Sequence, residues 1–337
     1  MFREVRFDDE IKNICEEMYK GNEHLFPFSS YEYLKLCKDC YRWQTHRWRE
    51  KHRFYLFEND DYPERKILAP INIHKGKAYL YTDLEAIAPL DIVYSSNVTN
   101  EDFELFWQEL RQAIPCNTFF VHGVREESLF CRFIEERLQD QILLKKDNIC
   151  VKIDFEDNYE EYRKRLTVKG RKNTRVMYNR ISNDGVHMEF HVADTEDVRR
   201  KNFTEVVDCW RRLQETKYQR NFGGYWGRFK FFHGTPSVIG LKTMSSARLF
   251  WLELNGEIAA VETGFVANNY SFLVPRGAMN KKFMRYSSGR LLIDQMLRYF
   301  IEKTDIRCLD LTNGDESYKL DVGGQRYMSY SYEIDMR

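Results

Sequence analysis

The sequence predicts a mixed α/β protein made of two similar units in tandem. Its C-terminal half contains three predicted strands joined by short turns, then a helix and a further strand. The turn Asn255-Gly256 is a strong signal for a tight hairpin. Residues 1–150 repeat the order of paired strands followed by helix, strand, helix and strand, which indicates an internal duplication. We therefore expect two domains, spanning 1–155 and 156–337.

The elements of the N-terminal half follow from hydrophobic periodicity and turn residues. Predicted helices occupy 11–19, 31–41, 103–110 and 126–138, and predicted strands occupy 53–57, 65–73, 78–82, 118–121 and 149–155. No glycine lies between Pro89 and Ser96, ahead of the third helix. We therefore expect this half to lack a cofactor site and either to have a structural role or to help bind the acceptor.

Composition narrows the class of protein. With 337 residues, of which 43% are hydrophobic, the chain can bury sizeable cores. Equal counts of 52 basic and 52 acidic residues argue against a general nucleic-acid or membrane binder. The first residues are charged and no long apolar run follows, so we expect neither a signal peptide nor membrane insertion. The eight scattered cysteines predict a reduced, cytoplasmic protein.

Two local features invite sharper interpretations. Cys37 and Cys40, with His46 following, resemble half of a zinc site, but no second cysteine pair of matching spacing exists. We therefore expect ordinary packing there, and no metal. The aromatic and basic run at 41–57 can in principle stack bases. Because it matches no known nucleic-acid module, we expect a partly exposed passage from helix to strand.

Residues 163–180 hold eight basic residues and no acidic one. This segment is either a solvated helix face or a contact for an anion. That anion is a cofactor's adenosine phosphate, an anionic polysaccharide or a tRNA backbone. A helix is expected at 194–214. The following stretch, 218–240, is rich in glycine and aromatic residues and predicts a loop that lines an acceptor pocket.

The helix predicted near the C-terminus begins at a loop suited to phosphate. The sequence there is Tyr286-Ser287-Ser288-Gly289-Arg290. Either serine is a natural N-cap, and the glycine lets the backbone approach a ligand closely. Unpaired N–H groups and the positive end of the helix dipole at such a start suit a phosphate. Further along the helix, we expect Asp294 and Arg298 to pair across one turn.

Glu262 is the candidate general base. It shares one predicted strand face with Ile258, Ala260 and Gly264. A carboxylate on so apolar a face has its pKa raised by desolvation, as a base for an ammonium or hydroxyl acceptor requires. The competing interpretation is a structural salt bridge or a solvent-facing strand.

The segment Gly314-Asp315-Glu316-Ser317-Tyr318-Lys319 follows the next predicted strand. Together with the serine-glycine loop, it resembles the GNAT acyltransferase superfamily. The likeness is to the branch related to cellulose-biosynthesis acetyltransferases and Fem-type peptidyltransferases, with Ser288 where that branch often has proline. The resemblance covers residues from about Tyr159 onward. It implies two tandem GNAT-like domains with a single acyl-donor site, in the second.

The resemblance also implies roles for the site residues. The backbone of Ser287, Ser288 and Gly289 would hold the pyrophosphate of acetyl-CoA or another acyl-CoA. Arg285 or Arg290 would add positive charge, and no metal would take part. Asp315, Tyr318 and Lys319 would form the catalytic edge. Tyr318 would protonate the leaving thiolate, and Asp315 would orient Lys319 or the acceptor. The competing interpretation makes these three residues a turn that only packs and pairs.

The implied reaction transfers an acyl group, most simply acetyl, to an amine or hydroxyl of a small molecule, sugar or polysaccharide precursor. Two alternatives stay open. One is a Fem-type transferase that uses aminoacyl-tRNA, which is less expected because the chain has no long helical hairpin; only under this alternative do we expect nucleic-acid binding. The other is a non-catalytic GNAT-like binding module.

Overall fold

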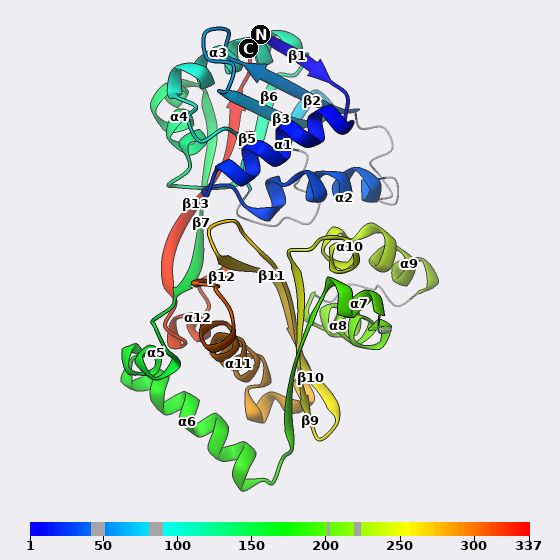
Figure 1. The fold of residues 1–337 in the computed structure, drawn as a ribbon, viewed down its shortest axis with the longest axis vertical. Helices are drawn as coiled ribbons and strands as arrows, with labels where there is room; N and C mark the ends of the chain where they lie inside the picture. Colours follow the sequence, from blue (N-terminus) through cyan, green and yellow to red (C-terminus); the bar gives the residue numbers. More distant parts are fainter. Residues whose placement is uncertain (42–50, 81–89, 201–202, 219–223) are drawn as a thin grey trace. The chain divides into compact units, whose positions relative to one another are not determined.

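The computed structural model describes the chain except residues 42–50, 81–89, 201–202 and 219–223. It confirms a mixed α/β fold (Figure 1). The chain forms two compact units. The N-terminal unit contains 1–149, 267–269 and 327–337, and the C-terminal unit contains 150–266 and 270–326. Among the described residues, no helix combines the length and the apolar character needed to cross a membrane.

The N-terminal unit is a sheet covered by helices. Its strand order is β1-β2-β3-β4-β6-β13, with β5 beside β3. Its strands are β1 (Phe2–Val5), β2 (Lys51–Glu58), β3 (Lys66–His74), β4 (Lys77–Leu80), β5 (Val93–Tyr94), β6 (Thr118–Arg125) and most of β13 (Gln325–Asp335). Its helices are α1 (Asp9–Gly21), α2 (Tyr31–Tyr41), α3 (Asn100–Ala113) and α4 (Leu129–Arg137), with 3-10 turns at Pro27–Ser29 and Gln139–Gln141.

Local signals explain where the N-terminal helices begin. Thr99 and Asp102 form a capping box at the start of α3, and the Ser128 side chain accepts two backbone N–H groups at the start of α4. Phe103 and Phe133 stack across these helices with ring centroids 5.4 Å apart. Cys37 and Cys40 are buried on α2, while His46 lies outside the described residues.

The C-terminal unit has the strand order β7-β12-β11-β10-β9-β8. Its strands are the end of β7 (Ile142–Asp154), from Cys150 onward, with β8 (Met188–Asp194), β9 (Ala247–Leu254), β10 (Glu257–Val266), β11 (Ser271–Met279) and β12 (Cys308–Asn313). Its helices are α5 (Tyr159–Arg165), α6 (Val168–Asn183), α7 (Thr195–Arg200), α8 (Thr204–Tyr218), α9 (Tyr225–Gly234), α10 (Pro236–Thr243), α11 (Ser288–Lys303) and α12 (Ser317–Asp321), with a 3-10 segment at Lys281–Tyr286.

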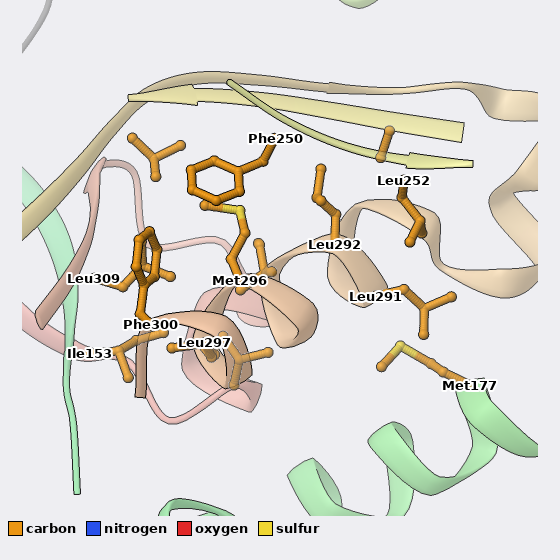
Figure 2. Close-up of a cluster of buried hydrophobic side chains, with 14 of the residues drawn as sticks. Ile153, Met177, Phe250, Leu252, Leu291, Leu292, Met296, Leu297, Phe300 and Leu309 are labelled. Atoms are coloured by element: carbon orange, nitrogen blue, oxygen red, sulfur yellow. The ribbon is translucent and has the colours of Figure 1, made fainter. Parts of the chain in front are cut away.

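The core of this unit lies between the sheet and α11. Figure 1 shows α11 on one face of β9–β11, with α7, α8 and α10 on the other. The apolar stripe of α11 packs against side chains of the sheet (Figure 2). Met177 of α6 lies beside Leu291, near the N-terminal end of α11. Leu291, Leu292 and Leu297 are fully buried, so truncating any of them to alanine would cost about 2–5 kcal/mol.

The two units share one order of strands and helices. In each, three antiparallel strands precede a helix, and the strand after that helix lies parallel to the third strand. The final antiparallel strand is exchanged between the units. β7, which follows the N-terminal helices, pairs with β12, whereas β13, which follows α12, pairs with β6. The predicted duplication and the expected mixed α/β fold class therefore agree with the structure.

Several boundaries differ from the expectations. The stretch expected to be a loop at 218–240 contains α9 and most of α10 in its described part. The helix expected at 194–214 is two helices, α7 and α8, after a strand that the sequence did not suggest, β8. β7 begins at Ile142, earlier than expected. The glycines and aromatic residues of 218–240 obscured the helical periodicity of that stretch. The polar residues along β8 obscured the alternation of apolar and polar residues that marks a strand.

Candidate functional site

The site is centred where two parallel strands stop pairing. Ser271, Phe272 and Leu273 of β11 pair with Cys308, Leu309 and Asp310 of β12. Beyond these residues β11 continues beside β10, while β12 continues beside β7. A bond from Thr312 Oγ1 to the Val274 carbonyl, at 3.0 Å, marks the point of separation. Ligands of open α/β sheets collect at such carboxyl ends.

The start of α11 lies beside this end of β11. A Cβ added to Gly289 would lie 3.7 Å from Met279. Ser287 occupies the N-cap position with φ 54° and ψ 48°, and its carbonyl accepts the Arg290 and Leu291 N–H groups. In the described part of the chain, nothing accepts the backbone N–H groups of Ser288 and Gly289. Such unpaired donors at a helix start favour an anion. Gly289 is partly exposed, whereas Ser288 is buried.

Neither serine caps the helix through its side chain, contrary to the expectation. The Ser287 side chain makes no cap bond. The Ser288 hydroxyl is buried and donates to the Ala259 carbonyl at 3.1 Å. This bond ties the start of α11 to β10, because Ala259 lies on that strand. The left-handed backbone of Ser287 is what turns the chain into the helix.

Arg285 and Tyr286 are held by the end of α6. The Arg285 guanidinium lies 3.0 Å from an Asp184 carboxylate oxygen, and the Tyr286 hydroxyl donates to the same carboxylate at 2.9 Å. That hydrogen bond raises the pKa of Tyr286. Arg180 donates to the Arg285 carbonyl at 2.8 Å. The positive charge of Arg285 is therefore already paired, and both residues position the loop.

Arg290 is also paired, in a cluster of four side chains. It lies 3.2 Å from a carboxylate oxygen of Asp321 and also donates to the Asp321 carbonyl. Lys169 and Asn173 of α6 contact the same carboxylate at 3.2 and 3.1 Å. Because Asp321 ends α12, this cluster joins α6, α11 and α12.

Glu262 lies on the face of the sheet that carries the start of α11. Gly277 and Met279 alternate on β11 and so share a face, and Met279 contacts Gly289. Glu262 lies directly opposite Gly277. Its carboxylate covers that glycine so closely that an added Cβ would be 1.8 Å from Oε1. A residue without a side chain at 277 is therefore required for Glu262 to adopt this position.

Lys319 is buried against the end of β12. Its ammonium donates to the carbonyls of Leu311, Asn313 and Gly314 at 3.0, 2.7 and 3.0 Å. Glu316 pairs with it at 3.2 Å. All three N–H groups therefore hold the turn after the strand in place.

Asp315 pairs with Arg326 at 3.2 Å. The expectation that Asp315 orients Lys319 is therefore wrong, because Glu316 is the carboxylate beside that ammonium. Tyr318, in contrast to Lys319, is exposed, at 39% of its surface. Of the catalytic edge, Tyr318 and Asp315 are therefore exposed, whereas Lys319 is buried.

The basic segment lines a cavity of about 320 Å³, bounded by Tyr159, Arg163, Arg175, Tyr178, Asn179 and Arg298. Two of its tyrosine hydroxyls, at 159 and 178, donate to the buried carboxylate of Asp294 at 2.8 and 2.6 Å. Burial raises the pKa of Asp294, and those two bonds oppose the shift. The expected pairing of Asp294 with Arg298 is therefore wrong.

Sequence reasoning missed the acidic partners of the site. Asp184 pairs with Arg285, and Asp321 pairs with Arg290. Each aspartate lies more than 30 residues from its arginine and at the end of another helix. The one available signal for Asp184 was the following Gly185, whose positive φ of 61° marks the end of α6. No pattern pointed to Asp321.

Comparisons with known proteins agree with this geometry. Residues 168–320 match the family model described as an acetyltransferase (GNAT) domain. No curated protein sequence matches the chain. Among solved structures, the fold is similar to FemX, with TM-score 0.62 and 8% identity over 99% of this chain and 97% of that one. It is also similar to a tandem GNAT protein from the clavulanic acid biosynthesis pathway, with TM-score 0.53 and 8% identity over 100% and 98% of the two chains.

A third similar structure is a conserved protein of unknown function from Bacteroides thetaiotaomicron VPI-5482, with TM-score 0.60 and 11% identity over 99% of both chains. At such low identities the structural likenesses establish the fold. The family model spans the elements that build the site, from α6 through most of α12. The C-terminal unit of this chain is therefore a domain of the GNAT superfamily.

Proposed function

We propose that this protein transfers an acyl group, most simply acetyl, from acyl-CoA to an amine or hydroxyl acceptor. The observation that carries the proposal is the pair of unpartnered N–H groups at Ser288 and Gly289, in the described structure, beside the separating strands β11 and β12. A pyrophosphate accepts such donors at a helix start. Arg285 and Arg290 support the loop through their acidic partners rather than as free charges.

The remaining residues divide the proton chemistry between them. Glu262 lies on the face that carries the start of α11 and is proposed to take the proton of the attacking amine or hydroxyl. The acceptor's new bond forms at the thioester carbonyl carbon and the carbon–sulfur bond breaks. Tyr318, which is exposed, then protonates the departing thiolate. Asp315, which is exposed and pairs with Arg326, is a proposed contact for the acceptor.

Lys319 has a different proposed role. Its ammonium is fully occupied by three carbonyls and Glu316, so we assign it to holding the turn that presents Tyr318. It is a positioning residue and contacts no reacting atom.

The Fem-type alternative has two observations in its favour. The fold resembles FemX over nearly the whole chain, and the cavity lined by Arg163, Arg175 and Arg298 has the charge that suits a phosphate of aminoacyl-tRNA. The two functions differ in their donor, so donor binding separates them.

Calorimetry with acetyl-CoA tests the proposal. We expect saturable binding with a stoichiometry near one, because the first unit lacks the glycine-bearing loop. Gly289→Leu should abolish binding without unfolding the protein, since its Cβ meets Met279 only at ordinary contact distance. Gly21→Leu is the matched control, because no atom lies within 4 Å of a Cβ there. Binding of aminoacyl-tRNA without any binding of acetyl-CoA would establish the Fem-type alternative instead.

A further inference from the structure

Two carboxylates face each other on neighbouring strands of the C-terminal sheet. Glu189 of β8 lies directly opposite Glu253 of β9 in the antiparallel register. Like charges in this arrangement destabilise a strand pair. Within the described part of the chain neither carboxylate pairs with a lysine or arginine. Their neighbours include two histidines, His187 and His191.

The distances around His191 do not fit hydrogen bonds. Its Nε2 lies 3.6 Å from a Glu189 oxygen and 3.7 Å from a Glu253 oxygen, beyond the range of about 2.7–3.2 Å for such bonds. That nitrogen is enclosed and, in the described structure, has no hydrogen-bond partner. A protonated histidine held as an ion pair would approach one carboxylate more closely.

The same distances fit a shared cation. Two ligands about 2.0–2.1 Å from a tetrahedral zinc ion lie roughly 3.4 Å apart. The ligand atoms of Glu189, His191 and Glu253 all lie within 4.8 Å of one another. His187, largely exposed, has its Nδ1 3.2 Å from the other oxygen of Glu189 and can supply a fourth ligand or yield that position to water.

The neighbouring tryptophan fixes two of these ligands. Trp251 donates its indole N–H to Glu253 Oε1 at 2.9 Å and stacks on the His191 ring, with centroids 4.8 Å apart and planes at 13°. Phe203 packs edge-on against the same indole at 5.4 Å. Partners of this kind orient metal ligands before the metal arrives.

We propose that Glu189, His191 and Glu253 bind a divalent transition metal of the zinc class. One imidazole and two carboxylates favour such an ion over magnesium, which prefers oxygen ligands alone. The ion would pin β8, the last strand in the order of this sheet, to β9. This site shares no residue with the proposed acyl-donor site. It differs from the expectation that the protein binds no metal, because that expectation rested on the spacing of the cysteines.

Titration of chelator-treated protein with zinc chloride tests the site. Calorimetry should show one zinc equivalent in the wild type, and magnesium should bind at least about tenfold more weakly. The His191→Ala variant and the double variant Glu189→Gln, Glu253→Gln should each lose that equivalent. Trp251→Phe, which keeps the ring but removes the donor to Glu253, should weaken binding by about 10–100-fold. His24→Ala, an exposed histidine outside the cluster, should bind like the wild type.

Melting curves keep the test independent of folding defects. Without zinc, the double glutamine variant should melt at or above the wild type, because the facing charges are gone. With zinc, the wild type and His24→Ala should gain stability, whereas His191→Ala and the double glutamine variant should not. A wild type that binds no zinc, or a double variant that binds it equally well, would overturn the proposal.

Discussion

Replacing Lys319 by methionine should destabilise the C-terminal unit strongly. Methionine fills a similar volume but removes the donors to the carbonyls of Leu311, Asn313 and Gly314. A buried carbonyl left without a donor costs about 1–3 kcal/mol. Because the last two carbonyls are only partly buried, water can satisfy part of their need. We therefore expect a loss of about 3 kcal/mol of unfolding free energy.

For a unit of this size, that loss lowers the melting temperature by about 6–12 °C. Calorimetric or circular-dichroism melting measures it directly. Lys164→Met is the matched control, because the Lys164 ammonium is exposed and pairs with Glu161 alone among described residues; it should change stability by at most about 0.5 kcal/mol. If Lys319→Met melts like the wild type but loses turnover, the lysine acts in the chemistry and our structural assignment is refuted.

Three further outcomes are expected. Tyr318→Phe should lower turnover by roughly 10²–10⁴-fold with donor affinity unchanged; unaltered turnover in a steady-state assay would remove the tyrosine from the chemistry. Gly277→Ala should displace Glu262, because the Glu262 Oε1 would lie 1.8 Å from the new methyl group. This variant should therefore lose both stability and turnover, whereas the control Gly289→Ala should melt like the wild type. Burial raises the pKa of Asp91 to about 7. The protonated Asp91 carboxyl therefore contributes to the free energy of unfolding at low pH, and this contribution is lost as pH rises through 7. Urea unfolding at pH 5 and 8 should therefore show a fall in stability in the wild type that Asp91→Asn lacks, and an equal fall in both would contradict this.

The features that the sequence predicted well are those set by neighbouring residues. The β9–β10 hairpin followed from Asn255-Gly256, which adopt φ of 52° and 75° as such a turn requires. The helix α11 followed from its apolar stripe, since the same residues now form the core beneath the sheet. In both cases the information lies within one or two turns of chain.

The interactions that the sequence did not predict involve residues far apart in the chain. The role of Lys319 is set by three carbonyls at the end of β12, which no side-chain pattern reveals. The partner of Asp294 could not be read from spacing, because Tyr159 and Tyr178 reach it from two other helices. The pairing of Glu189 with Glu253 likewise exists only in the register of β8 on β9.

The exchange of the final strands has a consequence for biosynthesis. The N-terminal unit uses β13, which pairs with β6, although that strand is translated after nearly all of the C-terminal unit. At about 5–20 residues per second, the roughly 190 residues that follow the first segment of this unit take about 10–40 s to translate. During that interval β6 exposes an unpaired strand edge, which is a site for aggregation or chaperone binding. A nascent chain stalled before Gln325 should therefore remain protease-sensitive in its N-terminal unit, and should become protected once Asp335 is released.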